Sequence, residues 1–176
     1  MEMSVGTIVT IVLLVSVLIL GIFLVQKIFS SATGVVDLTD QQLKSEVNKL
    51  FSEDKKVVIY PSTRLLEIKQ EATDGIGIGI KNLLEGVSGS QTFSYEVKLI
   101  EGTEKCGITE AQILNWITVG SKEADIPIPV GELISRKVMF TIPTGSPLCT
   151  VRFRVDVSTG TTAYWSEFFD VKVRAK

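Results

Sequence analysis

The sequence predicts a mainly β protein in which one long hydrophobic N-terminal helix precedes an antiparallel β-sandwich. Residues 5–25 contain no charged side chain and only three hydroxyl side chains, those of Thr7, Thr10 and Ser16. From Val57 onward, apolar and polar residues alternate in short runs that are separated by turn signals. Because no long helix interrupts these runs, the second half of the chain is typical of two packed antiparallel sheets.

The apolar stretch has the length of a membrane span. At about 1.5 Å per residue, a helix over 5–25 is roughly 30 Å long, which matches the hydrocarbon core of a bilayer. Only Glu2 is charged before it, and no Ala-x-Ala pattern follows it, so a cleaved signal peptide is not indicated. We expect a retained helix over 1–29. One charge on each side, Glu2 and Lys27, leaves its orientation open.

A neck is predicted over 30–56. Small residues and a glycine at 30–34 break the apolar pattern, and Thr39 is an N-cap signal for a short helix over 41–51. Its apolar residues Leu43, Val47 and Leu50 recur at helical spacing. Since its polar face is not strongly basic, we expect the apolar face to pack on the following domain rather than on a membrane.

The third predicted region, 57–176, is the β domain. The proline at position 61 predicts that the first strand lies at a sheet edge or that the chain changes sheets there. The final two strands flank a Ser-Thr-Gly-Thr-Thr turn and form a predicted hairpin. Strands or extended segments are predicted at 57–60, 64–69, 75–82, 92–100, 114–119, 125–131, 136–142, 150–157 and 167–174.

The run GIGIGIKN at 75–82 places Ile76, Ile78 and Ile80 on one face of a strand and three glycines on the other. Its G-x-G-x-G spacing has no following helix and no Lys-Ser/Thr, so neither nucleotide-binding fingerprint is met. The pattern instead predicts a strand whose glycine face is closely approached by another backbone.

Composition excludes several classes of function. The chain contains no histidine, which removes Ser-His-Asp and Cys-His catalysis and most zinc chemistry. A net charge of −2 with interspersed signs argues against nucleic acid as a partner. Asp156 and Asp170 alternate with arginines such as Arg152 in the final hairpin, which predicts a cross-strand charge ladder rather than a catalytic pair. We therefore expect no enzyme activity, cofactor, metal or small-molecule substrate.

Cys106 and Cys149 are the only cysteines. In a domain held outside a membrane they are typical of one disulfide, which would stabilise the fold by roughly 3–4 kcal/mol on the chain-entropy model. The other interpretation is two reduced, buried thiols that act as small apolar residues. The sequence leaves both open.

The N-terminal stretch resembles the start of mature archaeal pilins and archaellins, which open with a nearly charge-free helix of this length and often carry Gly-Thr near its start, as Gly6-Thr7 is here. The resemblance covers about 25 residues. Bacterial pilins have a glutamate at the fifth mature position, and Glu2 does not match it.

The β domain resembles the immunoglobulin-like (Ig-like) NPCBM-associated modules of archaeal surface proteins. The resemblance lies in the order of landmarks over 57–176, which are Pro61-Ser62, Lys81-Asn82, Tyr95, Trp116, Pro129 to Glu132 and Ile142-Pro143. It implies a structural or adhesive Ig-like sandwich, the type of ectodomain that archaellins and archaellum stator proteins also carry.

Together these resemblances imply a structural subunit of an extracellular surface filament that assembles with copies of itself through the N-terminal helix. The membrane would hold the chain at least before assembly. The alternative is a single-pass, membrane-anchored Ig-like ectodomain with a stator-like or adhesive role at the cell surface. What the helix packs against decides between the two.

Overall fold

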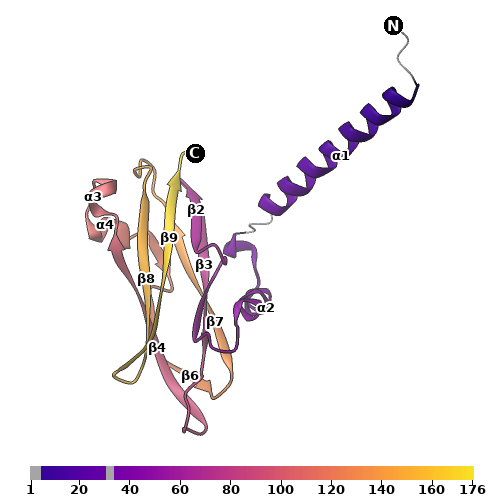
Figure 1. Ribbon diagram of the computed structural model, residues 1–176. Helices are drawn as coiled ribbons and strands as arrows, with labels where there is room; N and C mark the ends of the chain where they lie inside the picture. The colour runs from indigo at the N-terminus through magenta and orange to yellow at the C-terminus, as the bar shows by residue number, and fades with distance from the viewer. Residues whose placement is uncertain (1–4, 31–33) are drawn as a thin grey trace. The chain divides into compact units, whose positions relative to one another are not determined.

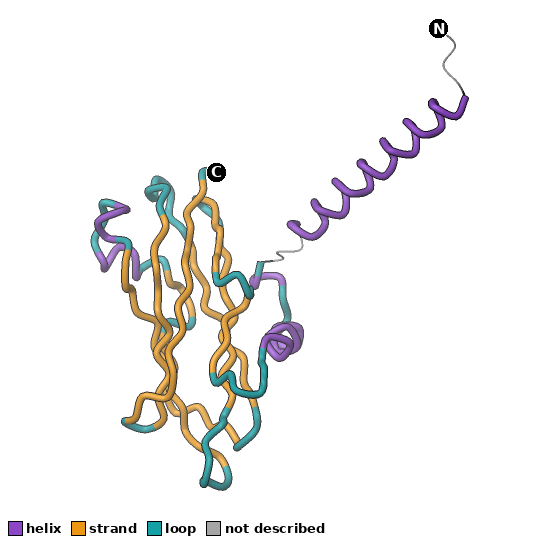
Figure 2. Tube along the Cα trace, in the orientation of Figure 1, coloured by secondary structure: helices purple, strands orange, loops and turns teal. Residues whose placement is uncertain are grey.

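The structure is a computed structural model that describes residues 5–30 and 34–176 (Figure 1). Contacts divide the chain into two compact units, Met1–Thr33 and Gly34–Lys176. The first contains helix α1, Val5–Ser30, and the second contains the strands and all other described helices (Figure 2). The predicted fold class, an apolar N-terminal helix followed by a β-sandwich, is confirmed. Residues 31–33 of the predicted neck, 30–56, lie outside the described residues.

The second unit has two sheets. The first has the strand order β1-β3-β7-β5 and the second has the order β2-β9-β8-β4-β6. The strands are β1 Val57–Tyr60, β2 Leu65–Lys69, β3 Thr73–Lys81, β4 Ser90–Glu101, β5 Ile117–Val119, β6 Lys122–Pro129, β7 Leu133–Thr141, β8 Thr150–Thr159 and β9 Thr162–Arg174. The helices are η1 Val35–Asp37, α2 Asp40–Leu50, α3 Thr103–Cys106 and α4 Glu110–Leu114.

The chain changes sheets around Pro61, as predicted. Strand β1 is an edge of the first sheet and β2 is an edge of the second. One pairing differs from the antiparallel prediction, because β2 runs parallel to β9, with Leu65 opposite Asp170 and Lys69 opposite Arg174. The two strands are about a hundred positions apart in the sequence, so local alternation carries no information about their relative direction.

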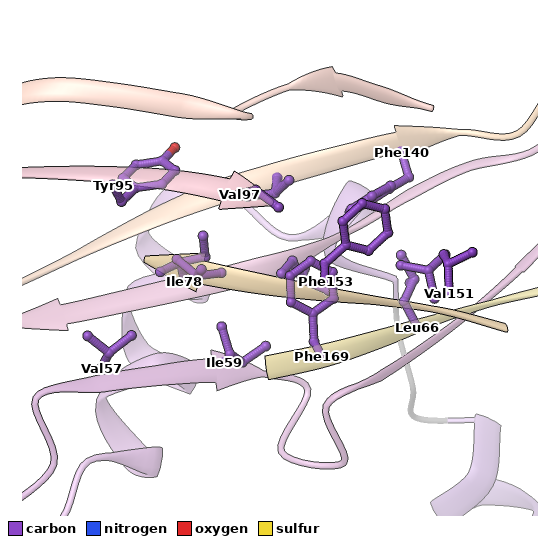
Figure 3. Packing of buried hydrophobic residues seen from close by; sticks show 14 of the residues in the cluster. Val57, Ile59, Leu66, Ile78, Tyr95, Val97, Phe140, Val151, Phe153 and Phe169 are labelled. Carbon is purple, nitrogen blue, oxygen red and sulfur yellow. The ribbon is translucent and has the colours of Figure 1, made fainter. Parts of the chain in front are cut away.

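The core lies between the two sheets and is centred on phenylalanine rings (Figure 3). Phe153 and Phe169 stack with ring centroids 5.4 Å apart, and Phe140 lies 5.4 Å and 5.9 Å from them. All three rings are 0% or 1% exposed. Alternation along β7, β8 and β9 points one residue in two inward, which brings these rings together from both sheets.

Helix α2 covers the glycine face of β3. A Cβ atom on Gly77 would lie 2.4 Å from Cδ1 of Leu43, and one on Gly79 would lie 2.3 Å from Cγ1 of Val47. The packing of the apolar face of α2 on the domain is therefore confirmed. The predicted close approach of another backbone is wrong for these two glycines, because side chains of α2 occupy that space. It holds for Gly75, where a Cβ atom would lie 2.4 Å from the carbonyl oxygen of Val138.

The segment between β4 and β5 forms two short helices. Thr109 and Gln112 make a reciprocal capping box that starts α4, and this helix ends at Leu114. The predicted strand at 114–119 is therefore wrong over its first half, and β5 keeps only Ile117–Val119. A disulfide joins Cys106 at the end of α3 to Cys149, just before β8.

The predicted C-terminal hairpin, β8–β9, is confirmed, and its turn contains Gly160 in the left-handed region at φ 56°. Beside this turn, Tyr164 ties the two sheets together. Its hydroxyl donates to the carbonyl oxygen of Lys81 at 2.7 Å and accepts from the backbone N–H of Leu83 at 2.9 Å. The end of the sandwich that carries the hairpin turn is thereby closed by a buried side chain.

Candidate functional site

Helix α1 presents apolar side chains on all sides. The large apolar residues from Ile8 to Phe23 are each between 50% and 65% exposed. Two of its hydroxyl groups are bonded to its own backbone, with Thr10 donating to the carbonyl of Gly6 and Ser16 to that of Val12, both at 2.8 Å. These two hydroxyls therefore satisfy their donors inside the helix and do not interrupt its apolar surface.

This surface suits a non-aqueous environment. The window Gly6–Phe23 has a mean hydropathy of 2.8, and it is long and apolar enough to cross a membrane. A helix that is hydrophobic all round is normally buried, either in lipid or among other helices. Burying one Val, Leu, Ile or Phe side chain contributes about 1.5–3 kcal/mol, so the whole helix carries a large driving force for either kind of burial.

The second unit begins with a docked segment, Gly34–Leu38. Val35 is 1% exposed and packs with Leu43 and Val47 of α2. Lys137 on β7 donates to the carbonyl oxygen of Leu38 at 2.5 Å. The segment is thus held against the first sheet by the apolar contact of Val35 and by the hydrogen bond from Lys137 on β7, an interior strand of that sheet.

Asp74 at the start of β3 receives the same segment. A Cβ atom on Gly34 would lie 2.5 Å from its carboxylate oxygen, so a larger residue here would have to displace the carboxylate. The backbone N–H groups of Gly75, Val36 and Val35 donate to Asp74, yet burial, the larger effect, raises its pKa above the ordinary value. The sequence did not reveal this contact, because nothing local to β3 indicates that the segment Gly34–Leu38 covers its first residues.

The outward face of the sheet β2-β9-β8-β4-β6 carries the predicted ladder of charges; we call it the charged face. Arg152 and Asp170 are directly opposite each other on β8 and β9 and form a two-point pair, Nε–Oδ1 2.8 Å and Nη2–Oδ2 3.0 Å. Arg174 on β9 lies 2.6 Å from Glu67 on β2. The predicted outward ladder of Asp156 and Asp170 is confirmed. Each exposed pair adds little stability on its own.

A shallow hollow of about 1230 Å³ opens over part of the charged face, on β6, β4, β8 and β9. Small residues make up much of its lining, among them Ser94, Ala124, Ser158, Ala163 and Ser166. Charged side chains line it as well, among them Lys98, Arg154 and Asp156. The Arg152–Asp170 pair lies on the same face outside this lining.

The sequence-selected polar residues do not converge on one site. Asp156 lies 2.6 Å from Nε of Arg154, whereas Asp170 pairs with Arg152, so the two carboxylates serve different arginines. Across the described ranges 5–30 and 34–176, no group of three or more His, Cys, Asp or Glu side chains is placed to hold a metal ion. The disulfide between Cys106 and Cys149 anchors a short helix and has no free thiol.

One inward-facing charge was not foreseen. Arg136 on β7 makes a two-point pair with Glu123 on β6, at 2.7 Å and 3.1 Å, across the open edge between the sheets. Burial and then the nearby Glu123 raise the pKa of Tyr95 to about 12. Alternation could have found this pair, because Arg136 has the same parity as the buried Val138 and Phe140, and an inward charge requires a partner.

Comparisons with known proteins add no functional assignment. No protein-family model matches the chain, and no curated protein matches its sequence. A family 123 glycoside hydrolase from Clostridium perfringens is similar over 64% of this chain at 9% identity and a TM-score of 0.45, and the chain covers only 22% of that enzyme. A Niemann-Pick type C2 protein from Japanese carpenter ant has 11% identity and a TM-score of 0.40, with 68% of this chain and 90% of that one covered.

The Pseudomonas fluorescens alkylpurine DNA glycosylase AlkC is similar over 66% of this chain and 30% of that one, at 12% identity and a TM-score of 0.35. All three TM-scores lie below 0.5. These likenesses therefore carry no inference about what the chain binds or does, and the function is argued from its own surfaces.

Proposed function

We propose that the chain is a structural subunit of an extracellular surface filament of the archaeal pilus or archaellum kind. The observation that carries this proposal is the all-round apolar surface of α1, whose Thr10 and Ser16 hydroxyls are bonded to its own backbone. Copies of α1 would bury this surface against one another, and the sandwiches would form the outer layer. The role is structural and uses no cofactor, nucleic acid or small-molecule substrate.

Packing of α1 against copies of itself agrees with its side chains. It is rich in Val, Ile and Leu, which fill the space between helices, and Gly21 has no atom within 4 Å of where its Cβ would be. A glycine on an otherwise bulky helix lets a neighbouring backbone approach closely. The bilayer would hold the same surface before assembly, which accounts for its length and lack of charge.

Electron microscopy of sheared surface material tests this proposal. Negative staining should reveal filaments that contain the chain, and Leu14→Lys, which puts a charge at a position 65% exposed on α1, should abolish them. Leu148→Lys is the matched control, because Leu148 is 61% exposed on the second unit and its change should leave filaments intact. Absence of the wild-type chain from sheared polymers would overturn the proposal.

The second candidate function is a single-pass, membrane-anchored ectodomain with a stator-like or adhesive role. The observation that favours it is the match between the Gly6–Phe23 window and the thickness of a bilayer. Detergent extraction separates the two functions. A discrete monomer or dimer at every detergent concentration supports the anchor, and polymers that survive mild detergent support the filament.

A further inference from the structure

The charged face contains two neighbouring rows of like charge. Strands β4 and β8 pair in antiparallel register with Lys98 directly opposite Arg154 and Glu96 directly opposite Asp156. We call the first pair the basic row and the second the acidic row. Along each strand the two rows are two residues apart, which is about 6.8 Å. The arrangement is therefore a basic stripe beside an acidic stripe, each crossing two strands.

Such rows are unfavourable within one sheet, because like charges directly opposite each other destabilise a strand pair. Their compensation runs along the strands and also diagonally between them, where Lys98 on β4 lies 3.4 Å from Asp156 on β8. Lys98 lies 3.1 Å from Glu96 on β4, and Arg154 lies 2.6 Å from Asp156 on β8. All four side chains keep substantial exposure, from 30% for Asp156 to 53% for Glu96. Both stripes are therefore paired within the chain and still partly exposed to an oppositely charged surface.

We propose that the charged face binds the charged face of a second copy of this chain, with the acidic row of each copy on the basic row of the other. A two-fold axis that lies in the plane of the interface, parallel to the rows and midway between them, produces this contact. Rotation about it keeps each strand facing its own counterpart and reverses the strand direction. Lys98 then faces the copy's Glu96, and Arg154 faces its Asp156. The interface is isologous and closes with two copies.

The shape of the face agrees with this arrangement. The row that follows the basic row along the strands carries Arg152 and its partner Asp170. The same rotation places this row over the region of the other copy that holds Ser94 and Ser158. That region is the part of the shallow hollow where small side chains lie. The half-exposed Arg152 of each copy, paired with Asp170, thus meets a recess on the other. Phe168, 42% exposed beside Arg154, adds apolar surface to the contact.

The two-fold contact has a consequence for function. Gly34, the first residue of the second unit, lies against Asp74 at the start of β3, at one end of the sandwich. The strands of both sheets run along the same long axis (Figure 1). Reversing the strand direction therefore places the two copies' Gly34 residues at opposite ends of the pair. The contact suits copies that reach one another from two different surfaces, such as two cells or two filaments, and does not depend on the proposed filament.

Vesicle clustering tests the proposal with the full chain. Two variants of the rows are needed, one all-basic, Glu96→Lys with Asp156→Lys, and one all-acidic, Lys98→Glu with Arg154→Glu. Each is reconstituted through α1 into phosphatidylcholine vesicles, and light scattering follows clustering at low salt. Wild-type vesicles should cluster, and each variant alone should cluster roughly tenfold more slowly, because like-charged rows then face each other. A mixture of the two variants should recover the wild-type rate.

The mixture is the decisive arm, because only contact between the rows of two copies explains variants that fail alone and succeed together. Glu53→Lys with Asp54→Lys changes the net charge as much as the all-basic variant does, in an exposed turn away from the face, and should cluster like wild type. Thermal melts show whether each variant is folded, and Glu96→Gln with Asp156→Asn is a milder acidic-row variant that should also slow clustering. No clustering by wild type, no recovery in the mixture, or equal loss in the control each overturns the proposal, whatever electron microscopy shows about filaments.

Discussion

The two units of this chain use the same residue types in opposite ways. In α1 the Val, Ile, Leu and Phe side chains face outward, and Leu14, Phe23 and their neighbours are at least half exposed. In the sandwich the same types face inward, and Phe153 is fully buried. The sandwich has therefore buried its apolar surface within its own unit, whereas α1 carries its apolar surface on the outside of its unit. This difference is the physical basis of the proposed assembly function.

Removal of one phenylalanine from each unit tests this contrast with the largest expected effect. Phe153→Ala deletes a ring that contacts Phe140 and Phe169 in the core, and we expect a loss of about 3–5 kcal/mol in the free energy of unfolding. Phe23→Ala on α1 should leave the denaturant midpoint of the sandwich unchanged. Equal losses from both substitutions would mean that α1 packs on its own sandwich.

Loss of the disulfide should have the next largest effect, and only on the sandwich. Cys106 and Cys149 are separated by 43 positions, so the chain-entropy model gives about 4 kcal/mol of stabilisation for the closed loop. We expect the double change Cys106→Ser with Cys149→Ser to lower the free energy of unfolding by about that amount, and hence the melting temperature. Membrane association of α1 should persist. An unaltered melting curve under reducing conditions would contradict this.

Glycine-to-alanine substitutions should change the stability of the two units in opposite directions. Gly79→Ala places a Cβ atom 2.3 Å from Val47 and should destabilise the sandwich by about 1–3 kcal/mol. Gly21→Ala meets no atom within 4 Å and should raise the helical stability of α1 by about 0.5–1 kcal/mol. Thermal melts followed by circular dichroism measure both changes, and a tolerated Gly79→Ala would show that α2 moves freely on β3.

The smallest expected effect is the pH dependence of Asp74. Burial raises its pKa in the folded chain above the ordinary value of the unfolded chain, so the folded state binds a proton more readily. Its contribution to stability is therefore greatest at low pH and falls as the pH rises through the folded pKa. The stability of the native chain relative to Asp74→Asn should decrease in that direction, measured by urea unfolding at several pH values. A relative stability that rises with pH would show that hydrogen bonding to the carboxylate outweighs its burial.

Local patterns predicted much of this molecule. Charge-free composition located α1, alternation located most strands, and a Thr39 cap with spaced apolar residues located α2. The parallel pairing of β2 with β9 was missed because it depends on which distant strands meet. Thr109 and Gln112 carry the capping-box spacing that starts α4, a signal that was present in the sequence.

The contacts that join separate segments were not accessible from the sequence. Asp74 receives a segment about forty positions away, and Lys137 reaches the carbonyl oxygen of Leu38 from about a hundred positions away. Neither residue differs locally from an ordinary surface charge. The outward ladder was predictable from alternation alone, whereas its like-charge rows required the register between β4 and β8.

Cross-linking through α1 tests the central claim most directly. Cys106 and Cys149 are joined to each other and no free cysteine is present, so Leu14→Cys introduces a single reactive thiol on the apolar helix. Mild oxidation of sheared surface material, followed by non-reducing electrophoresis, should give covalent dimers of the Leu14→Cys chain. The same chain dispersed in excess detergent should give far fewer. Helices that pack against copies of themselves predict this result, and a chain that stays monomeric in the sheared material would contradict it.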